Sequence, residues 1–244
     1  LLDALKWARI AGKNMFNSRS WYMGKIPFCN EVFKEAAVDI RYFLRVLSGG
    51  TKKIIILDLD DTLWGGKVGE VGWKNICLGG HDHIGEAYVD FQSALKSLSN
   101  RGILLAIVSK NEESVALEAM KSHPEMVLKP EDLAGWKINW KDKAQNIVNL
   151  LAELNLGIES AVFIDDSSFE RGRVRDVLHE VFTPEWPEDK RLYKQALLSL
   201  RCFDTPYISV EDTERSKMYV SERKRKGVRK MIGSQEEWLR SCDI

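Results

Sequence analysis

Two aspartates that follow an apolar run could carry out phosphoryl chemistry. Residues 54–57 are Ile-Ile-Ile-Leu, and Asp58 and Asp60 follow them two positions apart. Alternate side chains of an extended segment point the same way, so both carboxylates can face one crevice where a buried strand ends. Two close acids repel each other unless a cation lies between them, and Mg²⁺ is a natural occupant of such a site. A solvated acidic turn after a core strand is the alternative interpretation of an isolated Asp-x-Asp pair.

Polar residues near other apolar segments strengthen this interpretation. Ser109 ends a second apolar segment, and its hydroxyl could donate to a phosphate oxygen. Lys143 opens a helix-like stretch and could supply positive charge. Asp165 and Asp166 follow a third apolar segment and offer more oxygen ligands for a divalent cation. Because open parallel sheets bind their ligands at the carboxyl ends of their strands, we expect these residues to meet there.

Each of these residues can be given a role in a reaction with a carboxylate nucleophile. A carboxylate approaching a like-charged phosphoryl group needs positive charge, which Mg²⁺ and Lys143 could supply. Asp58 would attack and form an acyl phosphate, and Asp60 would protonate the leaving oxygen and later deprotonate the acceptor. Ser109 would orient the phosphoryl oxygens. The predicted metal ligands are four carboxylates, the last of them directly or through water: Asp58, Asp60, Asp165 and Asp166.

The order of these residues resembles the four motifs of the haloacid dehalogenase (HAD) superfamily of aspartate-nucleophile phosphotransferases. The motifs are DLDDT at 58–62, Ser109 after a strand, Lys143, and FIDD at 163–166. A response-regulator receiver domain has similar residues in a different order. Its paired acids come first, then its single phosphoacceptor Asp, and then Ser/Thr and Lys, whereas this chain has the opposite order at its ends. The resemblance implies a Rossmann-like α/β fold, with helices on both faces of a parallel sheet, and Mg²⁺ as the cofactor.

A closer resemblance, from about Trp21 into the C-terminal region, is to the FkbH-like branch of that superfamily. It implies a glyceryl transferase and phosphatase that acts on 1,3-bisphosphoglycerate, a phosphorylated three-carbon acid. The acceptor would be the phosphopantetheine thiol of an acyl carrier protein in polyketide-type biosynthesis. The segments that carry the resemblance are 21–27 (WYMGKIP), 58–66 (DLDDTLWGG), 109–111 (SKN), 123–126 (HPEM), 138–140 (INW), 155–157 (NLG) and 163–166 (FIDD).

Four residues beside these motifs are candidates for substrate binding. Trp64 could wall the pocket or pack in the core. Gly65 belongs to a glycine-rich segment that could bend tightly over the site. Lys110 could bind a second phosphate or a carboxylate, or lie at the surface, and Asn111 is a candidate beside it.

One position departs from the pattern of the branch. Members of the branch often have Cys before the Ser of the second motif, as a candidate thiol for holding the glyceryl group, whereas this chain has Val108. Cys77 is another candidate thiol, and the alternative interpretation is a small buried hydrophobe. Direct attack by the thiol of the carrier, or simple phosphatase action, would need no cysteine of the enzyme.

The elements that must position these residues alternate along the chain. Such alternation argues for a parallel sheet covered on both faces. The expected strands are 54–58, 103–108, 126–128, 161–164 and 179–182. The expected helices are 84–99, 112–121, 143–154 and 168–177.

The expected organisation is a helical lead-in at 1–50 with a break near 17–27, a HAD-like catalytic core at 51–200, and a helical tail at 201–244. Only about twenty residues, 63–84, separate the first motif from the first helix of the core. This is too few for an independent cap domain, so the site is expected to be open from above. An open site suits a bulky substrate such as a phosphopantetheine arm, as well as small phosphates.

The amino-acid composition argues against several classes of function. The 244 residues include 36 basic and 36 acidic side chains, a balance that argues against bulk affinity for nucleic acid. No apolar run approaches the roughly 20 residues that span a bilayer, so no membrane interaction is expected. Four cysteines without regular spacing fit a reducing cytoplasm rather than a disulfide framework.

Three functions therefore remain open. The first is an Mg²⁺-dependent glyceryl transferase and phosphatase that acts with an acyl carrier protein. The second is a stand-alone phosphatase of the same fold, which Val108 favours. The third is a non-catalytic domain that binds a carrier protein, although such a domain has no need for the full set of acidic and basic residues described above.

Overall fold

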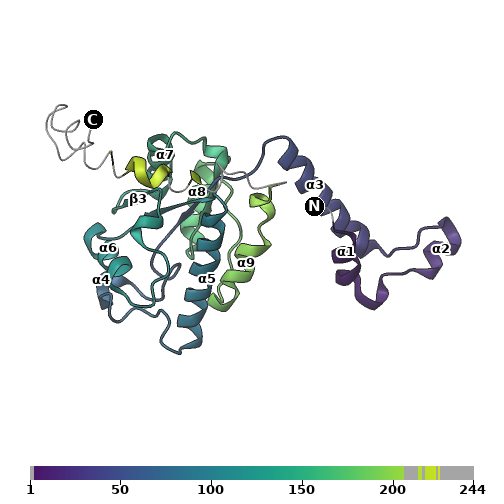
Figure 1. The fold of residues 1–244 in the computed structure, drawn as a ribbon, viewed down its shortest axis with the longest axis horizontal. Helices are drawn as coiled ribbons and strands as arrows, with labels where there is room; N and C mark the ends of the chain where they lie inside the picture. The colour runs from purple at the N-terminus through teal and green to yellow at the C-terminus, as the bar shows by residue number, and fades with distance from the viewer. Residues whose placement is uncertain (1–2, 206–213, 216–217, 224, 226–244) are drawn as a thin grey trace. The chain divides into compact units, whose positions relative to one another are not determined.

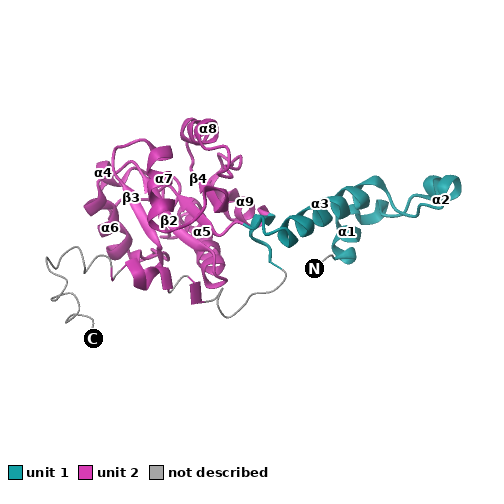
Figure 2. Cartoon of the chain, turned by 90° about the horizontal axis from the view of Figure 1, so that it is seen from above, with its two compact units in different colours: residues 1–51, 201–207 teal, residues 52–200, 208–244 magenta. Residues whose placement is uncertain are grey.

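The computed structural model divides the chain into two compact units, coloured separately in Figure 2. The residues that the structure describes are 3–205, 214–215, 218–223 and 225. Unit 1 comprises residues 1–51 and 201–207, and unit 2 comprises residues 52–200 and 208–244. Most of the predicted helical tail at 201–244 lies outside the described residues. The division into lead-in, catalytic core and tail therefore stays a prediction.

A four-stranded parallel sheet forms the centre of unit 2 and confirms the predicted fold class (Figure 1). Its strands, in the order β3-β2-β1-β4, are β1 (Ile54–Leu57), β2 (Leu104–Ser109), β3 (Gly135–Ile138) and β4 (Ala161–Ile164). Every residue of β1, β2 and β4 is buried, so both faces of the sheet are covered. Such strands read as continuous apolar runs, which is why three of the four can be recognised in the sequence.

The four predicted helices of unit 2 lie close to their expected positions, as α5 (His83–Asn100), α6 (Glu113–Ser122), α7 (Lys143–Glu153) and α8 (Ser168–Val177). Two helices that were not predicted are α4 (Val68–Val71) and α9 (Tyr193–Ser199). Short 3₁₀ turns connect several elements: η2 (Pro130–Asp132), η3 (Ile158–Ser160) and η4 (Lys190–Leu192). Apolar residues of α7, including Ile147 and Leu150, pack with Ile54, Ile56 and Phe163 of the sheet in one buried cluster. Helices α5 and α9 lie side by side (Figure 1).

Two predicted strands are wrong. Residues 126–128 are apolar and largely buried, but the backbone N–H groups of Val127 and Leu128 both donate to Oε1 of Gln92, at 3.0 Å. The segment therefore satisfies its donors with a side chain instead of a neighbouring strand. Residues 179–182 contribute only a single bridge, between Phe182 and Val162. Pro184 follows closely and cannot donate to a ladder, which limits further pairing.

The third strand of the sheet, β3, was not among the predicted strands. It pairs with β2 in parallel, and the register places Trp136 opposite Ile107. It lies at the edge of the sheet, and Trp136 and Lys137 are only partly buried. An edge strand of four residues with two half-exposed side chains has neither a continuous apolar run nor a clear alternation.

Unit 1 is helical, as the sequence indicates. Its elements are α1 (Ala4–Ala11), η1 (Gly12–Asn14), α2 (Ser18–Gly24), α3 (Asn30–Leu47) and η5 (Arg201–Phe203). The predicted break near 17–27 contains α2, whose first turn is capped by Asn17 accepting from the backbone N–H of Ser20. A buried carboxylate, Asp39, accepts from the indole N–H of Trp7 at 2.7 Å and pairs with Arg201.

The segment between β1 and α5 contains no helix longer than α4 in the part of the chain that is described. This agrees with the prediction of no or minimal cap domain. The described helices also include none that is long and apolar enough to cross a bilayer.

Candidate active site

The carboxyl ends of three adjacent strands carry the first group of predicted site residues. Asp58 directly follows β1, Ser109 ends β2 and Asp165 directly follows β4. Because β1 lies between β2 and β4 and all three strands are parallel, their carboxyl ends share one edge of the sheet. All three side chains are buried, and Asp165 is completely so. The predicted placement of these residues at strand ends is therefore observed.

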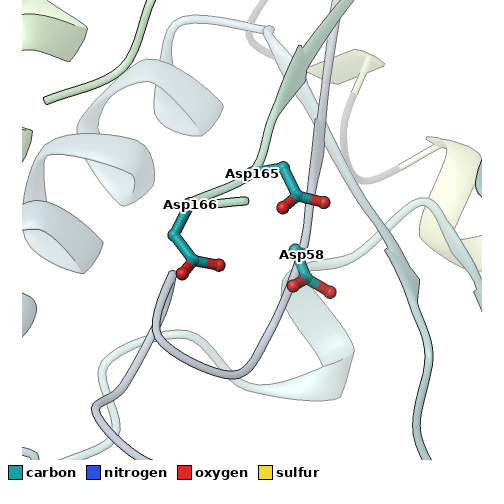
Figure 3. A group of neighbouring side chains, drawn as sticks. All are labelled: Asp58, Asp165 and Asp166. Atoms are coloured by element: carbon teal, nitrogen blue, oxygen red, sulfur yellow. The ribbon is translucent and has the colours of Figure 1, made fainter. Parts of the chain in front are cut away.

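Three carboxylates gather at this edge. Asp58, Asp165 and Asp166 each offer an oxygen that lies within 4.8 Å of the others (Figure 3). Figure 3 shows that Asp58 comes from one strand end while Asp165 and Asp166 come from the next. Three acids at this spacing form a set of hard oxygen ligands.

Lys143 is the buried counter-charge of this cluster. Its ammonium lies 3.0 Å from Oδ1 of Asp58 and donates to Oδ2 of Asp165 at 2.6 Å. Lys143 begins α7, where Asp142 caps the helix by accepting from the backbone N–H of Gln145. Burial opposes the charge of Lys143, but Asp58 and Asp165 outweigh burial and raise the pKa of the ammonium above its usual range. Lys143 therefore stays cationic next to the predicted nucleophile.

The pKa of Asp165 is strongly perturbed. Burial first, and then the negative charge of Asp58, raise the pKa of Asp165 to about 7, although Lys143 acts in the opposite direction. Its second oxygen, Oδ1, accepts from the backbone N–H of Ser167 at 2.9 Å. Burial is also the main cause that raises the pKa of Asp166. Burial is thus the main cause of both shifts, and the negative charge of Asp58 adds to each of them.

The turn that carries Asp165 and Asp166 is held by two residues that sequence reasoning did not single out. Arg171 is buried, and its Nη1 donates to the backbone carbonyls of both Asp165 and Asp166 at 2.7 Å. The hydroxyl of Thr62 accepts from the backbone N–H of Asp166 at 3.1 Å. Thr62 belongs to the DLDDT motif and could have been found there, whereas nothing in the sequence marks Arg171.

Asp60 lies outside the group of three clustered carboxylates, although it was predicted as a metal ligand. Its Oδ1 accepts from the indole N–H of Trp64 at 2.9 Å and from the backbone N–H of Val68 at 3.1 Å. Its Oδ2 accepts from the side-chain amide of Asn111 at 2.9 Å. Burial raises the pKa of Asp60, and the N–H groups of Val68 and Trp64 counteract part of that effect.

These contacts also change the interpretation of Trp64 and Asn111. Trp64 is completely buried and Asn111 is only 4% exposed, so neither forms an open wall for a substrate. Both side chains are instead directed at Asp60. Trp64 was predicted either to wall the pocket or to pack inside, and the structure has it packed inside.

Gly65 and Cys77 form a bridge that closes the loop between them. Each backbone N–H donates to the carbonyl of the other residue at 2.9 Å. A Cβ at Gly65 would lie 2.9 Å from Cβ of Cys77, so the close approach requires glycine. The thiol of Cys77 donates to Oδ2 of Asp82, at the start of α5. Burial and the adjacent Asp82 raise the pKa of this thiol, which is the opposite of what a nucleophilic cysteine needs.

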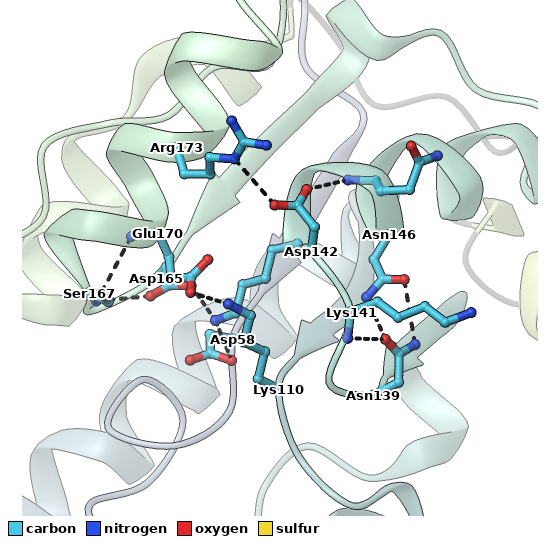
Figure 4. A network of polar contacts seen from close by, with 12 residues as sticks. Asp58, Lys110, Asn139, Lys141, Asp142, Asn146, Asp165, Ser167, Glu170 and Arg173 are labelled. Carbon is cyan, nitrogen blue, oxygen red and sulfur yellow. Dashed lines mark hydrogen bonds and ion pairs between the residues drawn. The ribbon is translucent and has the colours of Figure 1, made fainter.

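Lys110 forms an ion pair with a residue of α8. Its ammonium lies 2.6 Å from Oε1 of Glu170 (Figure 4). Lys110 is 37% exposed, so its ammonium remains within reach of solvent and of a ligand.

A second lysine near the cluster, Lys190, was also missed. Its ammonium lies 3.8 Å from Oδ2 of Asp166 and donates to the carbonyl of Asp61 at 2.9 Å. The hydroxyl groups of Tyr88 and Tyr193 donate to the same carbonyl. Asp61 has a φ of 55°, in the left-handed region, and these donors hold it there. Because Lys190 is far from the motif in the chain, only the fold brings them together.

The cluster fits a divalent cation. Asp58, Asp165 and Asp166 carry up to three negative charges, and Lys143 supplies one positive charge. Carboxylate oxygens are the ligands that Mg²⁺ prefers, and three of them meet here against a single buried ammonium. A divalent cation there would neutralise the remaining charge next to the buried carboxylate of Asp58.

Comparisons with known proteins add one informative relative. No protein-family model and no curated protein matches the chain. The chain resembles the crystal structure of the N-terminal part of BF1531 from Bacteroides fragilis, which contains a phosphatase domain and is complexed with Mg. The TM-score is 0.73 at 40% sequence identity, over 83% of this chain and 53% of that one. This chain therefore spans about half the length of that relative.

More distant matches are phosphatases as well. A 3-deoxy-D-manno-octulosonate 8-phosphate phosphatase from Moraxella catarrhalis has a TM-score of 0.37 at 16% identity, over 72% of this chain and 91% of that one. A cobalt-bound deoxy-D-mannose-octulosonate 8-phosphate phosphatase from Haemophilus influenzae has a TM-score of 0.39 at 14% identity, over 79% and 96%. The structural neighbours are HAD-superfamily phosphatases, and none of their names identifies the FkbH-like branch.

Proposed function

We propose that this chain is an Mg²⁺-dependent phosphotransferase of the HAD type in which Asp58 is the nucleophile. The observation that carries the proposal is the contact of Asp58 with the buried ammonium of Lys143, inside a cluster completed by Asp165 and Asp166. A phosphatase domain with Mg in a relative of 40% identity supports both the reaction class and the cofactor.

The side chains of this site suit each step of such a reaction. Asp58 attacks phosphorus, and the bond from phosphorus to the leaving oxygen breaks. Asp60 gives a proton to that oxygen and then takes one from the water or other acceptor that attacks the acyl phosphate. Lys143 and Ser109 hold the phosphoryl oxygens. Mg²⁺, when bound by Asp58, Asp165 and Asp166, supplies the charge neutralisation that lets two anions approach.

We further propose the finer function that the FkbH-like resemblance implies, glyceryl transfer from 1,3-bisphosphoglycerate to an acyl carrier protein. The thiol of the carrier would attack the acyl carbon, forming the thioester as phosphate leaves, and Asp58 would remove the second phosphate. The interaction of Cys77 with Asp82 and the apolar Val108 both favour direct attack by the thiol of the carrier over an enzyme thioester. The short connection between β1 and α5 suits a long phosphopantetheine arm.

Intact-mass spectrometry tests this proposal. A phosphopantetheinylated carrier protein is incubated with the chain, Mg²⁺ and enzymatically generated 1,3-bisphosphoglycerate, and an Asp58→Asn variant is the control. A dephosphorylated glyceryl adduct on the carrier is the expected result. With Asp58→Asn, the adduct should be absent or should keep its phosphate. No adduct with either protein would contradict glyceryl transfer.

A stand-alone phosphatase is the second candidate, and the phosphatase domain of the relative favours it. Release of phosphate from small phosphate esters, without any change in the mass of the carrier, is the result that this candidate predicts. A non-catalytic carrier-binding domain would release no phosphate at all. The cytoplasmic location and the acyl carrier protein as partner both stay proposals.

A further inference from the structure

The carboxylate of Asp60 is held by three N–H donors from separate parts of the chain. Oδ1 accepts from the indole of Trp64 at 2.9 Å and from the backbone of Val68 at 3.1 Å. Oδ2 accepts from the amide of Asn111 at 2.9 Å. Trp64 and Val68 follow β1, and Asn111 follows β2. Asp60 therefore connects the two loops that carry the predicted nucleophile and the predicted phosphate-binding serine.

Trp64 is well suited to fix a carboxylate. It is completely buried, so its single N–H must find a partner inside the protein, and Asp60 is that partner. The indole is rigid and closely packed, and the backbones of Asp60 and Trp64 form a bridge of their own. A donor with so little freedom sets the direction of the carboxylate more firmly than a flexible surface side chain would.

The orientation of the Asn111 amide is determined by its second contact. Its Oδ1 accepts from the backbone N–H of Glu112 at 3.0 Å, so the oxygen of the amide is assigned to that side. Nδ2 must then face Asp60, as a donor. Asn111 is 4% exposed, which leaves its amide little room to rotate.

The two oxygens of Asp60 are not equivalent in this arrangement. Each carboxylate oxygen offers about two lone-pair sites, and Oδ1 already has two donors while Oδ2 has one. We propose that Trp64 and Asn111 are positioning residues for Asp60, and that Oδ2 is the atom that exchanges the proton with the leaving group and the acceptor. This inference rests on the proposed phosphotransferase function.

The proton balance of the step follows from this assignment. The bond between Asp58 and phosphorus forms as the bond to the leaving oxygen breaks, and that oxygen takes the proton from Oδ2. Asp60 is then an anion with both oxygens hydrogen-bonded. When water attacks the acyl phosphate, its proton passes to Oδ2, phosphate leaves, and Asp58 and Asp60 return to their starting states.

The dependence of the rate on the leaving group separates this role from a merely structural one. An alkoxide is a poor leaving group and needs the proton, whereas p-nitrophenolate leaves without it. The value of kcat/KM reports the reaction up to the first irreversible step, which is the departure of the leaving group. Ethyl phosphate, phenyl phosphate and p-nitrophenyl phosphate are therefore compared with Mg²⁺ present.

Two variants weaken the contacts of Asp60 in different ways. Trp64→Phe removes the indole N–H and keeps an aromatic ring. Asn111→Ala removes the amide donor without adding a charge beside Asp60. Trp73→Phe is the matched control, because the indole of Trp73 donates to the carboxylate of Glu118 at 3.1 Å on an exposed surface. Asp60→Asn shows the full effect of losing the acid and base.

For both variants we expect kcat/KM to fall about 10- to 100-fold with ethyl phosphate and less than about 3-fold with p-nitrophenyl phosphate. The fall with ethyl phosphate is only part of the roughly 10²- to 10⁴-fold that general acid catalysis contributes, because Asp60 itself is kept. Trp73→Phe should match the wild type. An equal fall with all three substrates, or no change, would overturn the inference while the proposed function stands. A wild type that hydrolyses none of them would overturn both. If one variant does not fold, the other decides.

Discussion

At the residue scale, the central feature is a lysine buried between two carboxylates. Lys143 is 3% exposed and contacts Asp58 and Asp165, which are themselves buried. Removing one partner of such a group leaves charges without compensation, and this is far more harmful than losing a surface ion pair. The same residue should therefore matter both for the reaction and for the stability of the protein without metal.

Lys143→Met tests this directly. Without Mg²⁺, we expect the free energy of unfolding to fall by about 3 kcal/mol, because two buried carboxylates lose their counter-charge. Lys137→Met, which breaks the exposed pair with Glu153, should cost less than about 1 kcal/mol. Urea denaturation with and without Mg²⁺ measures both changes, and Mg²⁺ should restore part of the loss. Equal stability of Lys143→Met and wild type without Mg²⁺ would contradict the assignment.

The pH dependence of the alkylation of Cys77 tests whether its thiol pKa is raised. A raised thiol pKa means that the reactive thiolate forms only at higher pH, so alkylation of Cys77 by iodoacetamide should have its midpoint above that of glutathione. Asp82→Asn should lower the midpoint, because the negative charge is lost while the cap of α5 is kept. Peptide mass spectrometry resolves Cys77 from the other cysteines. A midpoint below that of glutathione would revive Cys77 as a nucleophile.

The predictability of the site also differs by residue. Asp58, Ser109, Lys143, Asp165 and Asp166 could be found because each follows or begins an element with a clear pattern. Trp64 and Asn111 were named as substrate-binding candidates, but the sequence could not show that both are turned toward Asp60. Such directions depend on packing, which no spacing of residue types records.

At the element scale, the strands that could be predicted are those buried on both faces. β1, β2 and β4 are continuous apolar runs, whereas the edge strand β3 has half-exposed residues and was missed. Residues 126–128 resemble a strand in sequence because all three are apolar, but the backbone N–H groups of Val127 and Leu128 donate to Gln92. The two errors therefore have different causes, the half-exposed side chains of β3 and the hydrogen bonds of residues 126–128 to a side chain of α5.

Gln92→Leu is expected to destabilise this part of the fold. Gln92 is completely buried, donates to the carbonyl of Leu63 at 2.8 Å and accepts from two backbone N–H groups. Leucine would leave these buried groups without partners, at about 1–3 kcal/mol each, so a loss of about 3 kcal/mol in the free energy of unfolding is expected. Gln145→Leu, at an exposed position of α7, should change it by less than about 0.5 kcal/mol. A loss below about 1 kcal/mol for Gln92→Leu in urea denaturation would refute this account.

The turn η4 connects a distant segment to the loop that follows Asp58. Lys190 donates to the carbonyl of Asp61 and lies 3.8 Å from Asp166. Lys190→Met removes a charged donor, and we expect a loss of about 2 kcal/mol in the free energy of unfolding together with lower phosphatase activity. Lys194→Met is the matched control, because Lys194 lies nearby in α9 and makes an exposed pair with Asp90 of α5. Unchanged stability and activity of Lys190→Met would show that this contact has no role.

At the scale of the whole molecule, the acidic cluster should make stability depend on Mg²⁺. A ligand that binds only the folded state adds about 2.7 kcal/mol at 100 times its Kd, so Mg²⁺ should raise the Tm of the full chain and a chelator should reverse the rise. Asp165→Asn removes one ligand of the cluster and should weaken the effect. Differential scanning calorimetry over a range of Mg²⁺ concentrations measures it. A Tm that does not respond to Mg²⁺ in the wild type would count against a metal site.

The bridge between Gly65 and Cys77 has a consequence for changing what the protein accepts. The two backbone hydrogen bonds hold the ends of the loop 66–76 together. The loop can therefore change in length without moving the ends that lead to β1 and α5. Doubling the length of a flexible loop costs only about 0.6 kcal/mol. New segments grafted between Gly69 and Ile76, beyond the N–H of Val68 that donates to Asp60, would lengthen this loop beside Asp60 while the bridge keeps its base closed. Grafting into this loop should therefore change which substrates the protein accepts without changing the residues proposed to carry out the reaction.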